Sequence, residues 1–176
     1  MQNVDKSIIS NTYTISDFLY RFSLIRRFIE KIEYTSDLNN LSFEDKVKKF
    51  LKEEEVDEYH SESFKQWNEE IFDTLRSGDF YKNLDDLFNH IEHERFLTLT
   101  VPVRLDHEKQ KEISLWVREK IDHDVLIKLR IDEKLIAGCL FTWSNQQYDY
   151  TFRKLRFEKH EKITESVKNI LTESVL

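Results

Sequence analysis

Apolar residues recur at helical spacing through the first half of this chain. Between residues 14 and 34 they are separated by alternating steps of four and three, which aligns them on one face of a helix. These positions are Phe18, Phe22, Ile25, Ile29 and Ile32. Thr14 and Asp17 match a capping box, so the pattern predicts a helix that begins at Thr14.

Three later segments repeat this spacing, and each is predicted to be a helix. Their apolar positions are Phe43, Val47, Phe50 and Leu51 in the first, Phe64, Trp67, Ile71 and Leu75 in the second, and Phe80, Leu84, Leu87, Phe88 and Ile91 in the third. Ser42 and Asp79 are the expected N-caps, and Gly78 fits the left-handed residue that ends the second segment. Helices this short cannot bury their apolar faces alone, so residues 14–94 predict an antiparallel bundle. The first dozen residues leave room for a further, weaker helix.

Near Phe96 the period of the pattern falls from about 3.6 to about 2, which is typical of a strand. The apolar positions there are Leu97, Leu99, Val101 and Val103. This change predicts a domain boundary, with residues 1–96 as an N-terminal helical bundle and residues 97–176 as a C-terminal α/β domain. Pro102 has no amide hydrogen, so it marks an edge position or a strand end.

The second half of the chain mixes both periods. Asp106 is the expected cap of a helix whose inward face is Ile113, Trp116, Val117 and Ile121, and a second strand follows with Val125, Ile127, Leu129 and Ile131 alternating. Residues 135–143 and 147–152 flank a hairpin turn, and a last helix is expected over 152–171. The predicted fold class is therefore α+β, mainly α, with the bundle followed by a small mixed sheet and two helices.

Composition narrows the classes of function. The chain has only two glycines and one proline, which leaves few residues for loops that cradle phosphate. With 34 acidic and 27 basic side chains its net charge is −7, so it offers nucleic acid no long-range attraction. The longest apolar run, residues 135–141, is far shorter than the ~20 residues that a membrane helix needs. Residues 1–10 lack the apolar core of a signal peptide, so we expect a soluble protein that is not exported by that route.

Candidate reactive residues are few. Cys139, the only cysteine, lies in the apolar run and is expected to be a buried core residue in a reducing compartment. His90 and His93, with Glu94 beside them, have a spacing that could hold a divalent metal, but no second ligand cluster accompanies them. Solvated surface is the favoured interpretation of these histidines, and we predict no active site, no cofactor and no metal site.

Basic residues crowd the start of the last predicted helix. They are Arg153, Lys154, Arg156, Lys159 and Lys162, and Glu158 and Glu161 partly neutralise them. A surface for a protein partner, a surface for anionic lipid and an ordinary solvated face all remain open, with a partner somewhat favoured over lipid. On the first long helix, Phe18, Phe22, Leu24 and Phe28 widen the apolar face, and they are a candidate groove for a helix from another chain.

The stretch from Val101 to Ile163 resembles the C-terminal domain of the delta subunit of F-type ATP synthases. The matching positions are Asp132, Leu135, Ile136, Gly138, Asp149, Arg153 and Leu155. This chain departs from the family pattern where Ala137 replaces the first glycine of a pair, and where Ser144, Asn145, Tyr150 and Thr151 replace turn residues. The chain is similar to a divergent member of that family. The matching residues themselves indicate a structural role, because they are turn and cap positions with no reactive group.

The resemblance implies a non-catalytic stator subunit that supports proton-driven ATP synthesis. The helical domain would receive the N-terminal segment of an alpha subunit, and the C-terminal domain would meet the b subunits of the peripheral stalk. The protein would then sit peripherally on the cytoplasmic face of the energy-transducing membrane, within the ATP synthase complex. Two alternatives remain, a free-standing interaction adaptor with the same two domains and a metal-dependent hydrolase that uses His90 and His93.

Overall fold

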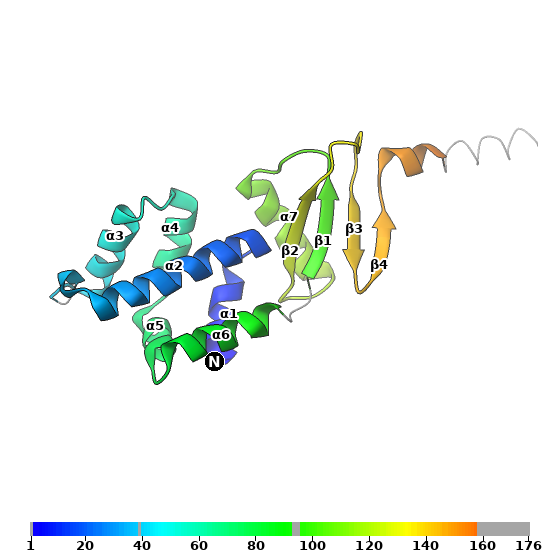
Figure 1. Cartoon of the computed structure of the whole chain (residues 1–176). Coiled ribbons are helices and arrows are strands. Elements are labelled where there is room, and N and C mark those ends of the chain that lie inside the picture. Colours follow the sequence, from blue (N-terminus) through cyan, green and yellow to red (C-terminus); the bar gives the residue numbers. More distant parts are fainter. Residues whose placement is uncertain (1, 39, 93–95, 158–176) are drawn as a thin grey trace, which may run out of the picture.

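The computed structural model describes residues 2–38, 40–92 and 96–157. Among these residues, the elements of the N-terminal part of the chain are all helices (Figure 1). They are α1 (Gln2–Ser10), α2 (Ile15–Tyr34), the short 3-10 helix η1 (Ser36–Leu38), α3 (Phe43–Glu53), α4 (Glu58–Lys65), α5 (Glu69–Arg76) and α6 (Phe80–Glu92). The C-terminal part contains β1 (Phe96–Val101), α7 (His107–Lys120), β2 (Leu126–Ile131), β3 (Leu140–Trp143) and β4 (Gln146–Asp149). Residues 152–157 are also helical, and the rest of the predicted last helix lies outside the described residues. The expected fold class, mainly helical with a small mixed sheet, is confirmed.

Helix starts follow the predicted caps. The hydroxyl oxygen of Thr14 accepts the amide of Asp17 at 3.1 Å, and that of Ser42 accepts the amide of Asp45 at 3.2 Å. Carboxylates of Asp79 and Asp106 accept amides three residues later in the same way. Each cap satisfies a backbone donor that the first helical turn leaves free.

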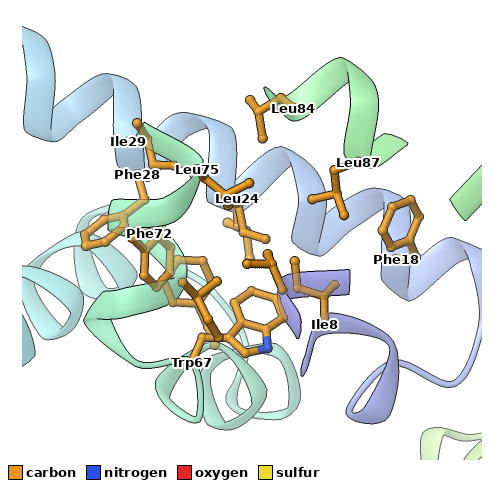
Figure 2. Packing of buried hydrophobic residues seen from close by; sticks show 14 of the residues in the cluster. Ile8, Phe18, Leu24, Phe28, Ile29, Trp67, Phe72, Leu75, Leu84 and Leu87 are labelled. Atoms are coloured by element: carbon orange, nitrogen blue, oxygen red, sulfur yellow. The ribbon is translucent and has the colours of Figure 1, made fainter. Parts of the chain in front are cut away.

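One predicted helix, the one that carries Phe64, Trp67, Ile71 and Leu75, is wrong. The structure divides it into two helices, α4 and α5. Asn68 caps α5 by accepting the amide of Ile71 at 3.2 Å, and this local bond competes with a continuous helix across residues 66–68. Trp67 lies in the break and is still buried, so the apolar spacing survives the change of direction (Figure 2). Gly78 adopts φ = 75° after α5, as the sequence predicted.

The core of the bundle is aromatic and is built around α2. Phe28 is fully buried, and its ring centroid lies 5.0 Å from that of Phe50, 5.1 Å from that of Phe72 and 5.6 Å from that of Phe64. Aromatic pairs at these separations add stabilisation to the area that they bury. Ile8 of α1 is also fully buried in this cluster, so the weak N-terminal helix is part of the core (Figure 2).

The sheet has the order β2-β1-β3-β4, with β1 and β2 parallel and the other pairs antiparallel. Pro102 follows the end of β1, which confirms a strand end, although β1 itself is central. Ser144 (φ 49°) and Asn145 (φ 64°) form the two-residue turn between β3 and β4. Two consecutive positive φ values give the turn that matches the twist of a hairpin.

The inward face of α7 differs from the prediction. Val117 is buried and Ile113 packs against the sheet cluster, as predicted, but Trp116 is 57% exposed and Ile121 is 36% exposed. Ser114 and Arg118 are buried instead. Arg118 turns inward because its guanidinium donates to main-chain carbonyls at the junction with the bundle, including those of Ile9 and Val125. A buried charge satisfied in this way fixes which face of the helix meets the rest of the molecule.

Two clusters of buried apolar residues occupy the bundle and the sheet. Residues before position 97 build the first cluster, joined by Leu126 of β2, and residues from Leu97 onwards build the second. The segment between α1 and α2 runs along β2, where the amide of Ile127 donates to the carbonyl of Tyr13 at 3.0 Å. The bundle and the sheet are therefore joined by backbone hydrogen bonds as well as by side-chain packing.

Candidate partner-binding surfaces

Most of the residues that carry the family resemblance meet in one cleft. This motif cleft has a volume of about 790 Å³. It is lined by Asp132, Lys134, Leu135, Ile136, Ala137, Thr151, Phe152, Arg153, Arg156 and Phe157. Four predicted residues, Asp132, Leu135, Ile136 and Arg153, thus come from two segments that are about twenty residues apart.

Asp132 shapes the loop that forms one wall of the motif cleft. Its amide donates to the carbonyl of Val101 at 2.9 Å, which ties the loop to the end of β1. Its carboxylate accepts the amide of Lys134 at 3.0 Å, and its carbonyl accepts the amide of Leu135 at 3.0 Å. These bonds form an Asx-type turn, so Asp132 has a structural role.

Gly138 makes the close approach between this loop and the segment after β4. Its φ is 86°, and a Cβ atom there would lie 2.2 Å from the carbonyl oxygen of Tyr150. On either side of it, Ala137 and Cys139 accept the amides of Phe152 and Tyr150 at 2.9 Å each. Only glycine fits this position without moving backbone atoms.

Asp149 organises the opposite wall. Its carboxylate accepts the amide of Thr151 at 2.8 Å, which is the amide-accepting role predicted where the hairpin enters the last helix. Hydrogen bonds from the Thr151 side chain and amide hold the pKa of Asp149 below its ordinary value. The carboxylate is therefore a fixed anchor for the turn.

The motif cleft and its surroundings expose large apolar side chains next to arginines. Ile136 is 84% exposed, Phe157 is 62% exposed, and Phe152 and Leu155 are each about half exposed. Arg153 and Arg156 line the same cleft. Exposed apolar and aromatic groups mixed with arginine are typical of surfaces that bind other proteins.

The residues predicted as a groove on the first long helix are largely buried in the structure. Phe18, Leu24 and Phe28 are at most 3% exposed and belong to the core of the bundle (Figure 2). Phe22 is partly buried, and its ring centroid lies 5.5 Å from that of Phe88. These four side chains do not form an open groove in the structure, because the bundle itself uses their apolar surface.

Sequence reasoning missed a buried polar cluster between the bundle and α7. Arg21 is fully buried, and its Nε atom donates to Nδ1 of His60 at 3.2 Å. The hydroxyl of Tyr59 donates to the carboxylate of Asp17 at 3.1 Å, and the ring of Tyr59 stacks on His107 with centroids 4.1 Å apart. Burial lowers the pKa of His60 and raises that of Tyr59. Arg21 lies three residues after Phe18, on the apolar face of α2. A charged residue at such a position was the sequence signal that could have indicated a buried polar cluster.

Cys139 packs against the buried cluster of the sheet, as a core residue would, but it is only partly buried. Its partial burial, followed by the negative charge of Asp149, raises the pKa of the thiol, so the reactive thiolate is disfavoured near neutral pH. His93 and Glu94 lie outside the described residues, and the side chain of His90 does too. Across the described ranges, no group of three or more His, Cys, Asp and Glu side chains could hold a metal ion. Within the same ranges, no helix has the length and apolar character needed to cross a membrane.

No family model matches the chain, and no curated protein matches it. The expected resemblance to delta subunits rests on seven sequence positions, four of which line the motif cleft, and on the order of the predicted elements. The motif cleft is the exposed surface on which a function can be proposed.

Proposed function

We propose that this protein is a non-catalytic stator subunit of an F-type ATP synthase, in the delta class, which links the catalytic head to the peripheral stalk. The observation that carries this proposal is the motif cleft, where four residues of the delta pattern line one exposed, largely apolar surface. The helical bundle followed by a small mixed sheet is consistent with the same class. The complex would hold the protein peripherally at the cytoplasmic face of the energy-transducing membrane.

The proposed role needs contact area and rigidity, with the chemistry supplied by other chains. Rotation of the central stalk drags on the catalytic head, so a stator link must resist dissociation under load. Apolar surface buried against another chain provides that resistance without a reactive residue. Ile136 and Phe157, exposed beside Arg153, have the character of residues that carry binding energy.

The two partners fit different parts of the chain. The bundle is proposed to receive the N-terminal segment of an alpha subunit, and the motif cleft to meet the end of the peripheral-stalk b subunits. Because Phe18, Leu24 and Phe28 are buried, the alpha segment would bind other residues of the bundle surface. These assignments rest on the delta-subunit resemblance together with the exposed surface of the motif cleft.

Calorimetry tests the two contacts separately. The purified chain should release or absorb heat with a peptide from the N-terminus of an alpha subunit and, in a second titration, with a peptide from the C-terminal end of a b subunit, each at micromolar concentration. Peptides of the same composition in scrambled order are the matched controls. If neither native peptide binds better than its scrambled control, the stator proposal is wrong.

A free-standing adaptor on the same architecture is the alternative, and affinity capture separates it from a stator subunit. The tagged chain, expressed in its own cells, should retain alpha and b subunits after mild solubilisation of the membranes. Recovery of a different set of proteins, with no ATP synthase chains, would favour the adaptor. Genes for other ATP synthase subunits beside its own would favour the stator.

A further inference from the structure

A second apolar surface lies on the sheet, beside α7. This sheet groove has a volume of about 600 Å³. It is lined by Leu97, Leu99, Val101, Leu105, Ile113, Trp116, Val117, Ile121, Gly138, Cys139, Phe141 and Tyr150. It contains no charged side chain among the described residues, which sets it apart from the motif cleft with its two arginines.

The groove exists because α7 covers only part of its face of the sheet. In Figure 1, α7 lies behind β1 and β2, and no described helix lies behind β3 and β4. On this uncovered part the ring of Phe141 stacks on those of Tyr148 and Tyr150, with centroids 4.7 Å and 5.4 Å apart. Tyr150 is 52% exposed, and Trp116 on the facing side of α7 is 57% exposed. A sheet face with this much aromatic surface normally packs against another element.

We propose that the C-terminal segment of this same chain, residues 163–171, covers the sheet groove. Its apolar residues Ile163, Val167, Ile170 and Leu171 stand at positions i, i+4, i+7 and i+8, which puts them on one face of a helix. A helix over residues 163–176 would extend for about 21 Å, and the six-residue strands β1 and β2 span about 20 Å. The segment therefore has the apolar face and the length that the groove requires.

The described chain ends where this segment can reach the groove. Phe157 lines the motif cleft together with Ala137 and Thr151, and the adjacent residues Gly138 and Tyr150 line the sheet groove. Residues 158–162 are all polar and can span up to about 17 Å when extended. The apolar segment can therefore begin up to about 17 Å from Phe157.

The lining argues for a helix over a small molecule. Binding sites for small molecules combine an apolar wall with a few polar groups that fix the orientation of the ligand. Here the polar side-chain atoms are those of Tyr150, Trp116 and Cys139, and no charged side chain lines the groove. The face of a helix with only aliphatic side chains matches such a wall. This inference does not depend on the stator role, because it leaves the motif cleft open for a partner.

Cys139 reports on the groove, because it lines it and is the only cysteine of the chain. The test variant is I163S/V167S/I170S, and the matched control is E165S/N169S/T172S, which makes three serine substitutions on the opposite helical face. We expect N-ethylmaleimide to label Cys139 of the full chain slowly at mildly alkaline pH. The test variant should label at least about tenfold faster, because the groove is then open most of the time, and the control should label at the rate of the unsubstituted chain. Equal rates in all three proteins would overturn the proposal.

A crosslink provides a second measurement that needs no disruptive substitution. The variant I170C should form a disulfide with Cys139 under mild oxidation, whereas N169C, on the other face, should not. Equal crosslinking of the two variants, or none in I170C, would contradict docking. Protection of Cys139 that appears only when a b-subunit peptide is added would also overturn it, since the partner would then occupy the groove. Binding of the alpha peptide to the bundle is expected to be the same in every variant, so the two proposals can fail independently.

Discussion

Arg118 of α7 donates from its Nη2 atom to the carbonyl oxygen of Ile9 at 3.0 Å, across 109 residues of sequence. The same guanidinium also donates to the carbonyls of Ser10, Thr12 and Val125. Burial lowers the pKa of Arg118, so these main-chain oxygens are what makes a charged group acceptable there. One side chain thereby fixes the end of α1, the start of β2 and the orientation of α7.

Replacing Arg118 is expected to destabilise the fold. R118A leaves several buried carbonyls without their donor, and it should lower the free energy of unfolding by about 3 kcal/mol. Urea denaturation followed by far-UV circular dichroism measures the change. R104A, at an exposed position in the loop before α7, should change stability by less than about 0.5 kcal/mol. A loss in R118A no greater than that in R104A would mean that the junction does not depend on this residue.

Gly138 and Gly78 form a matched pair for the effect of a Cβ atom. Both have positive φ, but Gly78 has open space around it, whereas a Cβ at Gly138 would lie 2.2 Å from the Tyr150 carbonyl oxygen. G78A should therefore cost about 1 kcal/mol, from the left-handed conformation alone. G138A should cost at least about 3 kcal/mol, because backbone atoms must also move. Thermal unfolding of the two variants gives the comparison, and equal losses would show that the close approach is not tight.

His60 is expected to make the free energy of unfolding fall when the pH becomes mildly acidic. Burial sets the pKa of His60 below its ordinary value, the positive charge of Arg21 and the nearby His107 lower it further, and the carboxylates of Asp57 and Asp17 oppose the shift. The unfolded chain then takes up this proton before the folded chain does, so stability is full above about pH 6.5 and falls as the pH drops towards the folded pKa. Urea midpoints of the wild type at a series of pH values should show this decline.

The matched variants for that pH series are H60Q and H123Q. H60Q removes the titrating group and should flatten the decline below about pH 6.5. H123Q replaces an exposed histidine and should keep the pH dependence of the wild type. If the H60Q profile is as steep as that of the wild type, other groups are responsible for the pH dependence.

Ile136 tests the motif cleft as a partner surface. It is 84% exposed, so I136D should leave the free energy of unfolding within about 0.5 kcal/mol of the wild type. Affinity for the peptide from the C-terminal end of a b subunit should fall by about tenfold or more, because a charge would face an apolar contact. L115D, at an exposed leucine of α7 outside the cleft, is the control and should bind normally. Equal affinity of both variants would place the contact elsewhere.

The local structure followed from the sequence more closely than its assembly did. Short-range signals such as the Thr14 cap and the turn at Gly78 depend on neighbouring residues, and they appear as predicted. The break between α4 and α5 was missed because Trp67 keeps the apolar spacing through it. The buried face of α7 could not be predicted, because Arg118 finds its partners about a hundred residues away. The strand order β2-β1-β3-β4 depends on pairings of the same long range.

Of the candidate site residues, some lie at an exposed surface in the structure and others are buried in the core. Asp132 and Arg153 were singled out by a pattern, and the fold brings them to one cleft. Phe28 was singled out by its place beside the apolar face of a helix, and the bundle buries it completely. Amphipathic spacing predicts that a side chain is covered, but it does not say whether the cover belongs to the same chain or to another.

The pairing of Tyr13 with Ile127 also covers part of the open edge of the sheet. A parallel sheet that ends in an unpaired strand presents free amides and carbonyls, and these can recruit a strand from a second molecule. Here residues 13 and 14 pair with the edge of β2 at Ile127, and the short β4, with Gln146 and Gln147, forms the other edge of the sheet. The connection between the first two helices therefore blocks a strand of a second molecule from pairing with β2 at Ile127.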